Sequence, residues 1–252
     1  MKQIRIMALV ALAALMAGAT PLPAAAQLLK FLHRSPPAAI QTPAPQATTS
    51  QATTPAARAS GVAPGKFDFY LMALSWSPGF CDTNPSGQGR KQCAIGAKLG
   101  FVLHGLWPQN ERGYPSNCEG SRAVSKTALD ETIGVYPAIG LARYEWRKHG
   151  TCTGLSPSAY FAAAARAFHA VTIPDAFKTP TAAQTMAPIE IMRAFSKANP
   201  GIRPGMMAVA CRKGELQEVR LCLTKDLHAF RACNQVMQRS CHASSIQIPA
   251  ER

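Results

Sequence analysis

Eight cysteines, all placed after residue 80, constrain what this chain can fold into more than any other feature. They are Cys81, Cys93, Cys118, Cys152, Cys211, Cys222, Cys233 and Cys241. An even number of cysteines in an exported chain is typical of a disulfide framework. We expect four disulfides, and the spacing of the cysteines leaves their pairing open. A zinc site is the alternative, because His149 and Cys152 are three residues apart, but the chain has no Cys-X-X-Cys pair.

The first 26 residues have the pattern of a secretory signal peptide. Lys2 and Arg5 precede an apolar run over residues 6–16, and alanines at positions 24–26 offer a cleavage site. The run is too short to span a bilayer comfortably, although an uncleaved membrane anchor is the alternative. We therefore expect a periplasmic or secreted protein with no stable membrane insertion.

Residues 27–65 differ in composition from residues 66–252. The first segment is dominated by Pro, Ala, Thr, Gln and Ser, and it has too little apolar surface to offset the entropy of ordering the chain. This composition predicts a disordered linker. The remaining 187 residues have the size of one domain, which we expect to be a monomer.

The predicted domain is basic. It contains 22 Lys and Arg against 13 Asp and Glu, a net charge of about +9, because five of the 27 basic residues of the chain precede residue 66. A positive surface favours a polyanionic partner such as nucleic acid, anionic lipid or an acidic glycan. Charge alone does not choose among these partners.

Apolar patterning predicts strands over residues 67–76, 100–103, 206–211 and 216–223, the last two joined by a hairpin turn at Lys213–Gly214. It predicts helices over residues 125–142, with a break at Pro137, over 144–149 and over 189–197, and another that begins at Ser156. We expect His104 at the end of the second strand, followed by a tight turn over residues 105–108. Residues 109–125 are expected to form a loop.

The segment around His149 concentrates ionisable side chains. On a helix, Glu145, Lys148 and His149 share one face at positions i, i+3 and i+4. Trp146 would then anchor the helix in the core, and Gly150 would end it in a left-handed conformation. One interpretation is catalytic, with His149 exchanging a proton while Glu145 and Lys148 support charge. The other is a surface helix with an ion pair.

His104 and His149, together with Lys148, favour general acid–base catalysis on a phosphodiester. RNA carries its own nucleophile, the 2′-hydroxyl. One imidazole can remove the 2′ proton while the other protonates the departing 5′ oxygen, and Lys148 would neutralise the phosphorane. This chemistry needs no metal and no other cofactor, and DNA is inert to it.

Two segments of the chain resemble the active-site segments of the ribonuclease T2 family. They are Phe-Val-Leu-His-Gly-Leu-Trp-Pro at residues 101–108 and Glu-Trp-Arg-Lys-His-Gly-Thr-Cys at residues 145–152. Weaker similarities at residues 67–81 and 216–222 extend the resemblance over about residues 66–242. It implies an α+β fold with helices around a central antiparallel sheet. It also implies endonucleolytic cleavage of single-stranded RNA through a 2′,3′-cyclic phosphate.

The same resemblance implies roles for individual residues. His149 would be the base and His104 the acid, Glu145 and Lys148 would stabilise the transition state, and Trp107 would help to hold a nucleobase. The implied disulfides are Cys118–Cys152, Cys211–Cys241 and Cys222–Cys233, which leaves Cys81–Cys93.

Some positions depart from the family pattern. Tyr144 stands where many members have a histidine associated with phosphate binding. A phenol can donate a hydrogen bond to phosphate but brings no positive charge at acid pH, so we expect weaker phosphate binding or a shifted pH optimum. Gln109 replaces an acidic residue that reads the base in some relatives, and Ser75 replaces a glutamine, so we expect low base specificity. Tyr114, in the predicted loop, is a further candidate for contact with the substrate.

Two other functions compete with that of a ribonuclease. One is a catalytically inactive relative that binds RNA or a partner through the same basic groove, although such a protein usually lacks one of the two histidines. The other is a disulfide-rich exported domain that binds the cell envelope electrostatically. The envelope hypothesis explains the charge and the cysteines, but it leaves the His104 and His149 segments without a purpose.

Overall fold

The structure is a computed structural model that describes residues 63–84, 91–178 and 180–252. The predicted signal peptide and residues 27–62 of the predicted linker lie outside the described residues. Within the described ranges, no helix is both long enough and apolar enough to cross a membrane.

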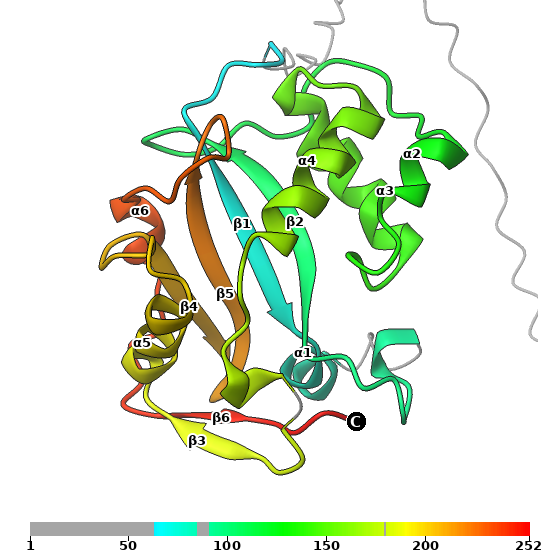
Figure 1. Ribbon diagram of the computed structural model, residues 1–252. Coiled ribbons are helices and arrows are strands. Elements are labelled where there is room, and N and C mark those ends of the chain that lie inside the picture. The colour runs from blue at the N-terminus through cyan, green and yellow to red at the C-terminus, as the bar shows by residue number, and fades with distance from the viewer. Residues whose placement is uncertain (1–62, 85–90, 179) are drawn as a thin grey trace, which may run out of the picture. The chain divides into compact units, whose positions relative to one another are not determined.

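A six-stranded sheet forms the centre of an α+β fold (Figure 1). The strand order is β2-β1-β5-β6-β3, and β4 is a further partner of β5. The pairings are antiparallel except that β6 joins β5 in parallel through Glu215 and Gln247. The predicted fold class is therefore confirmed. The strands are β1 (Phe69–Trp76), β2 (Phe101–Gln109), β3 (Gln184–Met186), β4 (Met207–Arg212), β5 (Glu215–Thr224) and β6 (Ile246–Ile248).

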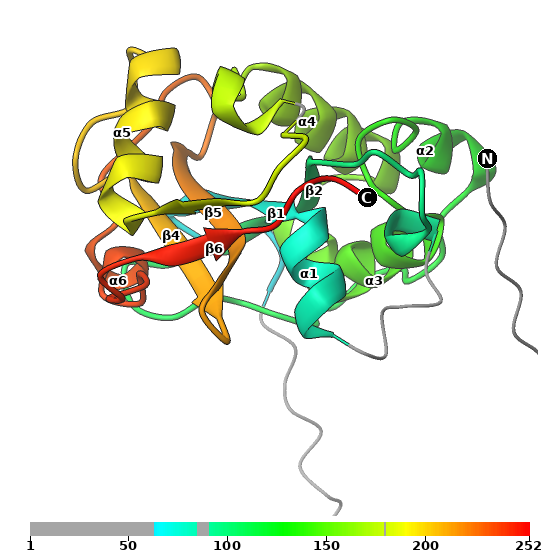
Figure 2. The same cartoon turned by 90° about the horizontal axis from the view of Figure 1, so that it is seen from below.

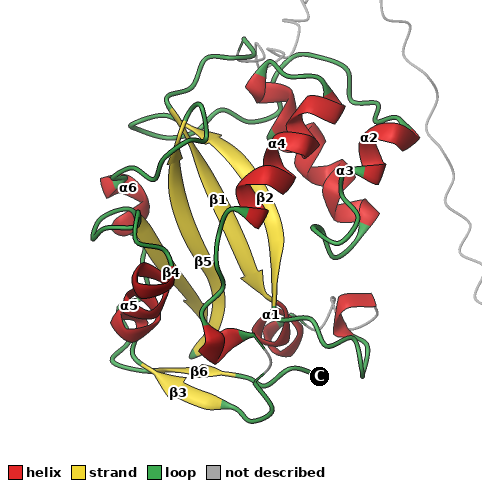
Figure 3. Ribbon diagram, in the orientation of Figure 1, coloured by secondary structure: helices red, strands yellow, loops and turns green. Residues whose placement is uncertain are grey.

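Helices lie on both sides of this sheet. Seen from below, α4 and α5 lie on one side and α6 on the other (Figure 2), and Figure 3 separates helices, strands and loops by colour. Because α3 follows β2 only after a long connection, its last turn is free to lie against the face of β2. The helices are α1 (Ser77–Thr83), α2 (Lys126–Asp130), α3 (Ile139–Lys148), α4 (Pro157–His169), α5 (Pro188–Ala198) and α6 (Asn234–Met237).

The two faces of the central strands bury different residues. On one face, alternate residues of β1 such as Met72 and Leu74 are fully buried in the main core, which also takes in Phe161 of α4 and Phe195 of α5. On the other face, a smaller apolar cluster comprises Phe69, Leu71, Ala208, Cys222, Cys233 and Val236. This smaller cluster covers only part of its face, which leaves room there for polar side chains.

An extra residue interrupts the pairing of β2 with β1. Ala73 pairs with Gly105, and the next residue of β1 pairs with Leu103, so His104 has no partner on β1. Such a β-bulge lets two consecutive residues share a face of the sheet. The alternation then shifts by one position, so Leu103 and Leu106, three positions apart, are both fully buried on the core side. His104 therefore lies inside a nine-residue strand. The predicted strand end and tight turn were wrong, because pairing with β1 continues through both.

Several local predictions are confirmed. The turn between β4 and β5 has positive φ at Lys213 (52°) and Gly214 (79°), as a two-residue hairpin requires. The hydroxyl of Ser156 accepts a hydrogen bond from the backbone N–H of Ala159 at the start of α4. The helix predicted over residues 189–197 is α5.

The break expected at Pro137 is present, but it extends over residues 131–138, so the segment predicted as helical over 125–142 forms two separate helices. The chain forms the short α2, turns, and begins α3 at Ile139. Gly134 lies between these helices with a left-handed φ of 73°, and Pro137 follows it. Neither residue fits a helix interior, so the apolar pattern extends across a break.

Four disulfides cross-link the domain, and their pairing is the one that the family resemblance implied. They are Cys81–Cys93, Cys118–Cys152, Cys211–Cys241 and Cys222–Cys233. Cys118–Cys152 ties the loop before α2 to the residues that follow α3. Beside it, the backbone N–H of Asn117 donates to the carbonyl of Lys148 at 2.8 Å.

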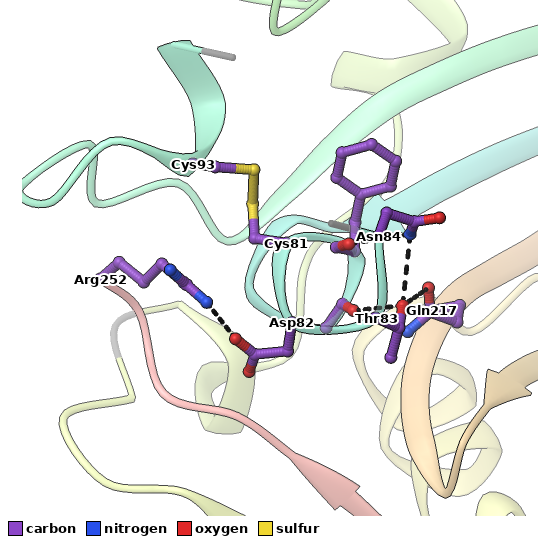
Figure 4. Close-up of a disulfide and its surroundings, with 9 residues drawn as sticks. Cys81, Asp82, Thr83, Asn84, Cys93, Gln217 and Arg252 are labelled. Atoms are coloured by element: carbon purple, nitrogen blue, oxygen red, sulfur yellow. Dashed lines mark hydrogen bonds and ion pairs between the residues drawn. A yellow bond between two sulfur atoms is a disulfide. The ribbon is translucent and has the colours of Figure 1, made fainter. Parts of the chain in front are cut away.

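The Cys81–Cys93 bridge lies beside contacts that hold α1 in place (Figure 4). The hydroxyl of Thr83 donates to Gln217 of β5 at 3.0 Å. Asp82 pairs with Arg252, so α1 is attached both to the sheet and to the C-terminal segment.

Removing the Cys118–Cys152 bridge should cost more stability than removing Cys81–Cys93. The bridges join residues 34 and 12 positions apart, and a longer closed loop restricts the unfolded chain more. The expected losses in the free energy of unfolding are about 4 and about 3 kcal/mol for paired Cys→Ser variants. Urea denaturation of both variants measures this order, and the reverse order would contradict it.

Candidate active site

The end of α3 meets the middle of β2 and brings together the four residues predicted to be catalytic. His104 comes from β2, Glu145 and Lys148 come from the last turn of α3, and His149 caps the helix. Oε1 of Glu145 lies 3.7 Å from Nε2 of His104. The helix face predicted from sequence spacing therefore does reach the second histidine segment.

Trp107 lies between the two imidazoles. Its ring centroid is 5.1 Å from that of His104 and 5.3 Å from that of His149. The indole Nε1 donates to Oε2 of Glu145 at 2.6 Å. Gly105 makes room for this bond, because a Cβ there would lie 2.3 Å from both bonded atoms. A side chain at position 105 would therefore force the strand and the helix apart.

Gly150 is needed for packing and does not adopt the left-handed conformation that we expected. It lies in a 3-10 helix over Gly150–Thr153, and the left-handed residue is Gly154, with φ 78°. A Cβ at Gly150 would lie 2.4 Å from the ring of Trp146. That ring is buried and its N–H donates to the carbonyl of Ser121, so Trp146 anchors α3 as predicted.

His149 is held in an environment that favours its neutral form. Its side chain is buried, and its Nδ1 has no hydrogen-bond partner among the described residues. Burial, the charge of Lys148 and the charge of His104 lower the pKa of His149 to about 3. The imidazole is therefore neutral, and Nε2 is the nitrogen left to meet a substrate.

His104 has the opposite environment. Its Nδ1 lies 2.5 Å from Oε1 of Glu218 on β5. Burial alone would lower the pKa of His104, but the hydrogen bond and charge of Glu218, with the charge of Glu145, raise it above its ordinary value despite Arg220. The two imidazoles of one site thus have pKa values displaced in opposite directions.

Glu145 is a carboxyl with 1% exposure and one hydrogen bond. Its Oε2 accepts from Trp107, and its Oε1 has no hydrogen-bond partner among the described residues. Burial raises the pKa of Glu145 to about 7, although His104, the indole N–H and Lys148 all act to lower it. At neutral pH this carboxyl is balanced between its charged and neutral forms.

Lys148 and Tyr144 form a pair one turn apart on α3, and Lys148 also lines a cavity beside His149. Nζ of Lys148 donates to the Tyr144 hydroxyl at 2.9 Å and lies 5.3 Å from the centre of its ring. This hydrogen bond, opposed by slight burial, raises the pKa of Lys148, so its ammonium is charged at every working pH. The Tyr144 hydroxyl keeps its own proton free to donate.

Two of the cavities that border the histidines contain the other predicted substrate contacts. The larger, about 230 Å³, has His149, Trp107, Gln109 and Tyr114 in its wall. The smaller, about 80 Å³, has His104 and Ser75. Among the described residues, no three His, Cys, Asp or Glu side chains are grouped to hold a metal ion.

Comparison with known proteins identifies the family of this chain. The sequence model of the ribonuclease T2 family matches residues 67–233. The chain belongs to this family.

Relatives of this ribonuclease T2 member come from bacteria, a slime mould and plants. The ribonuclease of Aeromonas hydrophila is 38% identical over 186 residues, covering 73% of this chain and 84% of that protein. Ribonuclease DdI of Dictyostelium discoideum is 29% identical over 222 residues, covering 81% and 93%. The RNase-related protein from Calystegia sepium superposes with a TM-score of 0.57 at 24% identity, over 74% of this chain and 98% of that one, a likeness that supports the fold.

Sequence reasoning missed some residues that surround the site in this T2 member. Glu218 and Arg220 lie beside His104 and Trp107. Their one signal was alternation, which placed them on the same side of β5. Gln235 and Arg239 of the α6 region line the larger cavity, and nothing in the sequence indicated that this segment would reach it.

Glu145 should lower the stability of the folded protein at alkaline pH. Its pKa in the folded protein, about 7, lies above its ordinary value of 4.5. Ionisation of Glu145 therefore destabilises the folded state fully above pH 7, and this destabilisation disappears as the pH falls to 4.5. Glu145→Gln keeps an acceptor for Trp107 but cannot ionise. It should be more stable than wild type by roughly 2–3 kcal/mol at pH 8.

Chemical denaturation at pH 8, 6 and 4.5 measures this difference. Glu131→Gln, at an exposed position after α2, is the matched control and should leave stability unchanged at all three values. A Glu145→Gln effect of the same size at every pH would contradict the raised pKa.

Proposed function

We propose that this domain is a metal-independent endoribonuclease that cleaves single-stranded RNA by transphosphorylation through a 2′,3′-cyclic phosphate. Family membership supports endoribonuclease activity. The observation that carries the mechanism is the opposite displacement of the two histidine pKa values. A pair of titratable groups driven apart in this way suits one to act as base and the other as acid.

In the proposed reaction His149 is the base and His104 is the acid. Neutral His149 accepts the proton of the 2′-hydroxyl as the 2′ oxygen forms a bond to phosphorus. The bond from phosphorus to the 5′ oxygen breaks, and His104 gives its Nε2 proton to that oxygen. The products are a 2′,3′-cyclic phosphate and a free 5′-hydroxyl, so protons and electrons balance within the substrate and the two imidazoles.

Lys148 and Glu145 act on the charge that develops at phosphorus. The ammonium of Lys148 is permanently positive, and it stabilises the additional negative charge of the phosphorane electrostatically. Glu145 lies 3.7 Å from the nitrogen of His104 that delivers the proton. Its charged form favours imidazolium, and its neutral form can donate a hydrogen bond to a phosphate oxygen.

The cavities support low base specificity. None of the described residues that line the larger cavity is acidic, and Gln109 and Gln235 are amides. An amide group can donate as well as accept hydrogen bonds, so these side chains suit more than one nucleobase. Trp107 also lines this cavity, and an indole ring can stack on a nucleobase of any kind.

The disulfides and the predicted signal peptide support an exported enzyme. We assign residues 66–252 to the catalytic domain, as a monomer, behind a signal peptide (1–26) and a linker (27–65), in the periplasm or outside the cell. Four disulfides are stable in such oxidising compartments.

Incubation with total RNA in excess EDTA, followed by chemical analysis of fragment 3′ ends, tests the function. Wild type should yield 2′,3′-cyclic phosphates, and His149→Ala should lose at least about 10²-fold in rate. Cleavage abolished by EDTA would refute the metal-independent mechanism. Intact RNA that still binds the protein would indicate an inactive RNA-binding relative, and binding to anionic glycan or lipid alone would indicate an envelope protein.

Tyr144→His should strengthen substrate binding at acid pH only. A histidine there is positively charged below about pH 6.5, whereas a tyrosine side chain has no group that can carry a positive charge. We expect KM for a dinucleoside phosphate to fall several-fold at pH 5 and to stay close to that of wild type at pH 8. Tyr144→Phe, which removes the hydroxyl alone, is the control and should change KM similarly at both pH values. An equal effect of Tyr144→His at both would contradict the charge argument.

A further inference from the structure

Glu218 is a buried carboxylate with both oxygens engaged. It is 8% exposed. Oε1 lies 2.5 Å from Nδ1 of His104, and Oε2 accepts from Nε and Nη2 of Arg220 at 2.8 and 2.7 Å. A buried charge is tolerated only where such partners compensate for lost water. The carboxylate therefore joins a guanidinium on one side to a histidine on the other.

The sheet gives Glu218 this reach. Glu218 and Arg220 alternate on β5 with Val219 and Leu221, which are fixed in the main core. The strand between β5 and β2 is β1, and its residues beside Arg220 and Glu218 are Ala73 and Ser75. Because both intervening side chains are small, the Glu218 side chain can cross β1 and meet His104 on β2.

We propose that Glu218, itself held by Arg220, is a positioning residue that keeps His104 protonated and directs its Nε2 toward the leaving oxygen. This inference rests on the proposed ribonuclease function. With Nδ1–H donating to the carboxylate, the ring cannot rotate freely and Nε2 is the only nitrogen that can serve the substrate. Arg220 keeps Glu218 ionised and stationary.

Charged groups from two elements face His104. Glu218 and Arg220 come from β5, and Glu145 and His149 come from the end of α3. Burial acts to raise the pKa of Glu218, but His104 and Arg220 lower it overall. Among the described residues, Glu218 is therefore the carboxylate in direct contact with His104 that stays charged across the working pH range.

Glu218→Gln tests the proposal, because it preserves size and removes charge. Arg220 donates to the same side chain, so the amide oxygen turns to Arg220 and the amide NH₂ faces Nδ1 of His104. Imidazolium then loses its partner. Arg220 is less suitable for substitution, because it also lies 6.0 Å over the Trp107 ring and lines the larger cavity.

The experiment compares two substrates over a range of pH. One is a dinucleoside phosphate, whose 5′ alkoxide needs an acid in order to leave. The other is a nucleoside 3′-(p-nitrophenyl phosphate), whose phenolate leaves without protonation. Glu218→Gln should lower kcat for the dinucleoside phosphate about 10²-fold, with little change in KM, and move the alkaline limb of its pH profile to lower pH. The p-nitrophenyl substrate should lose only a few-fold.

Glu131→Gln serves as the matched control and should behave as wild type on both substrates. An equal loss on the two substrates would mean that Glu218 supports the fold and not the acid, and no loss on either would also overturn the proposal. NMR titration of His104 adds a readout that needs no activity, and its pKa should fall in Glu218→Gln. Wild-type protein inactive on both substrates would refute the ribonuclease function, whereas an unchanged His104 pKa would refute the role of Glu218.

Discussion

The hydrogen bond from the Trp107 indole to the Glu145 carboxyl holds the active-site elements together. It joins β2 to α3 at 2.6 Å and places the indole between the two imidazoles. Gly105 and Gly150 permit the close approach, because a side chain at either would collide with this contact or with Trp146. This hydrogen bond therefore helps to fix the strand that carries His104 relative to the helix that carries Lys148.

The two histidines show how one small site can provide two different proton affinities. His149 lies where burial and neighbouring cations act together against its charge. His104 is also buried, but carboxylates on two sides reverse the effect of burial. This arrangement lowers the stability of the protein, because Glu145 has a buried oxygen with no hydrogen-bond partner among the described residues. Such unsatisfied groups are commonly found at functional sites.

Local chemistry made part of this structure predictable. The β4–β5 turn, the Ser156 cap and the shared face of Glu145 and Lys148 depend on residues a few positions apart, and each was found. The disulfide pairing and the α+β sheet followed from the family resemblance. The features that sequence reasoning missed depend on contacts between residues far apart in the sequence. The bulge at His104 is set by a strand thirty residues earlier, and the contact of Glu218 with His104 spans 114 residues.

The β-bulge makes the length of β2 as important as its composition. Before the bulge the odd-numbered residues face the core, and after it the even-numbered residues do. Leu103 and Leu106 are therefore both buried, while His104 and Trp107 share the other face. Deleting one residue at the bulge would restore regular alternation, with Leu103 and Leu106 still facing the core and Trp107 still on the opposite face. The extra position adds a second residue to the face of Trp107, so a deletion would remove either the imidazole of His104 or the glycine at position 105 that makes room for the bond between Trp107 and Glu145.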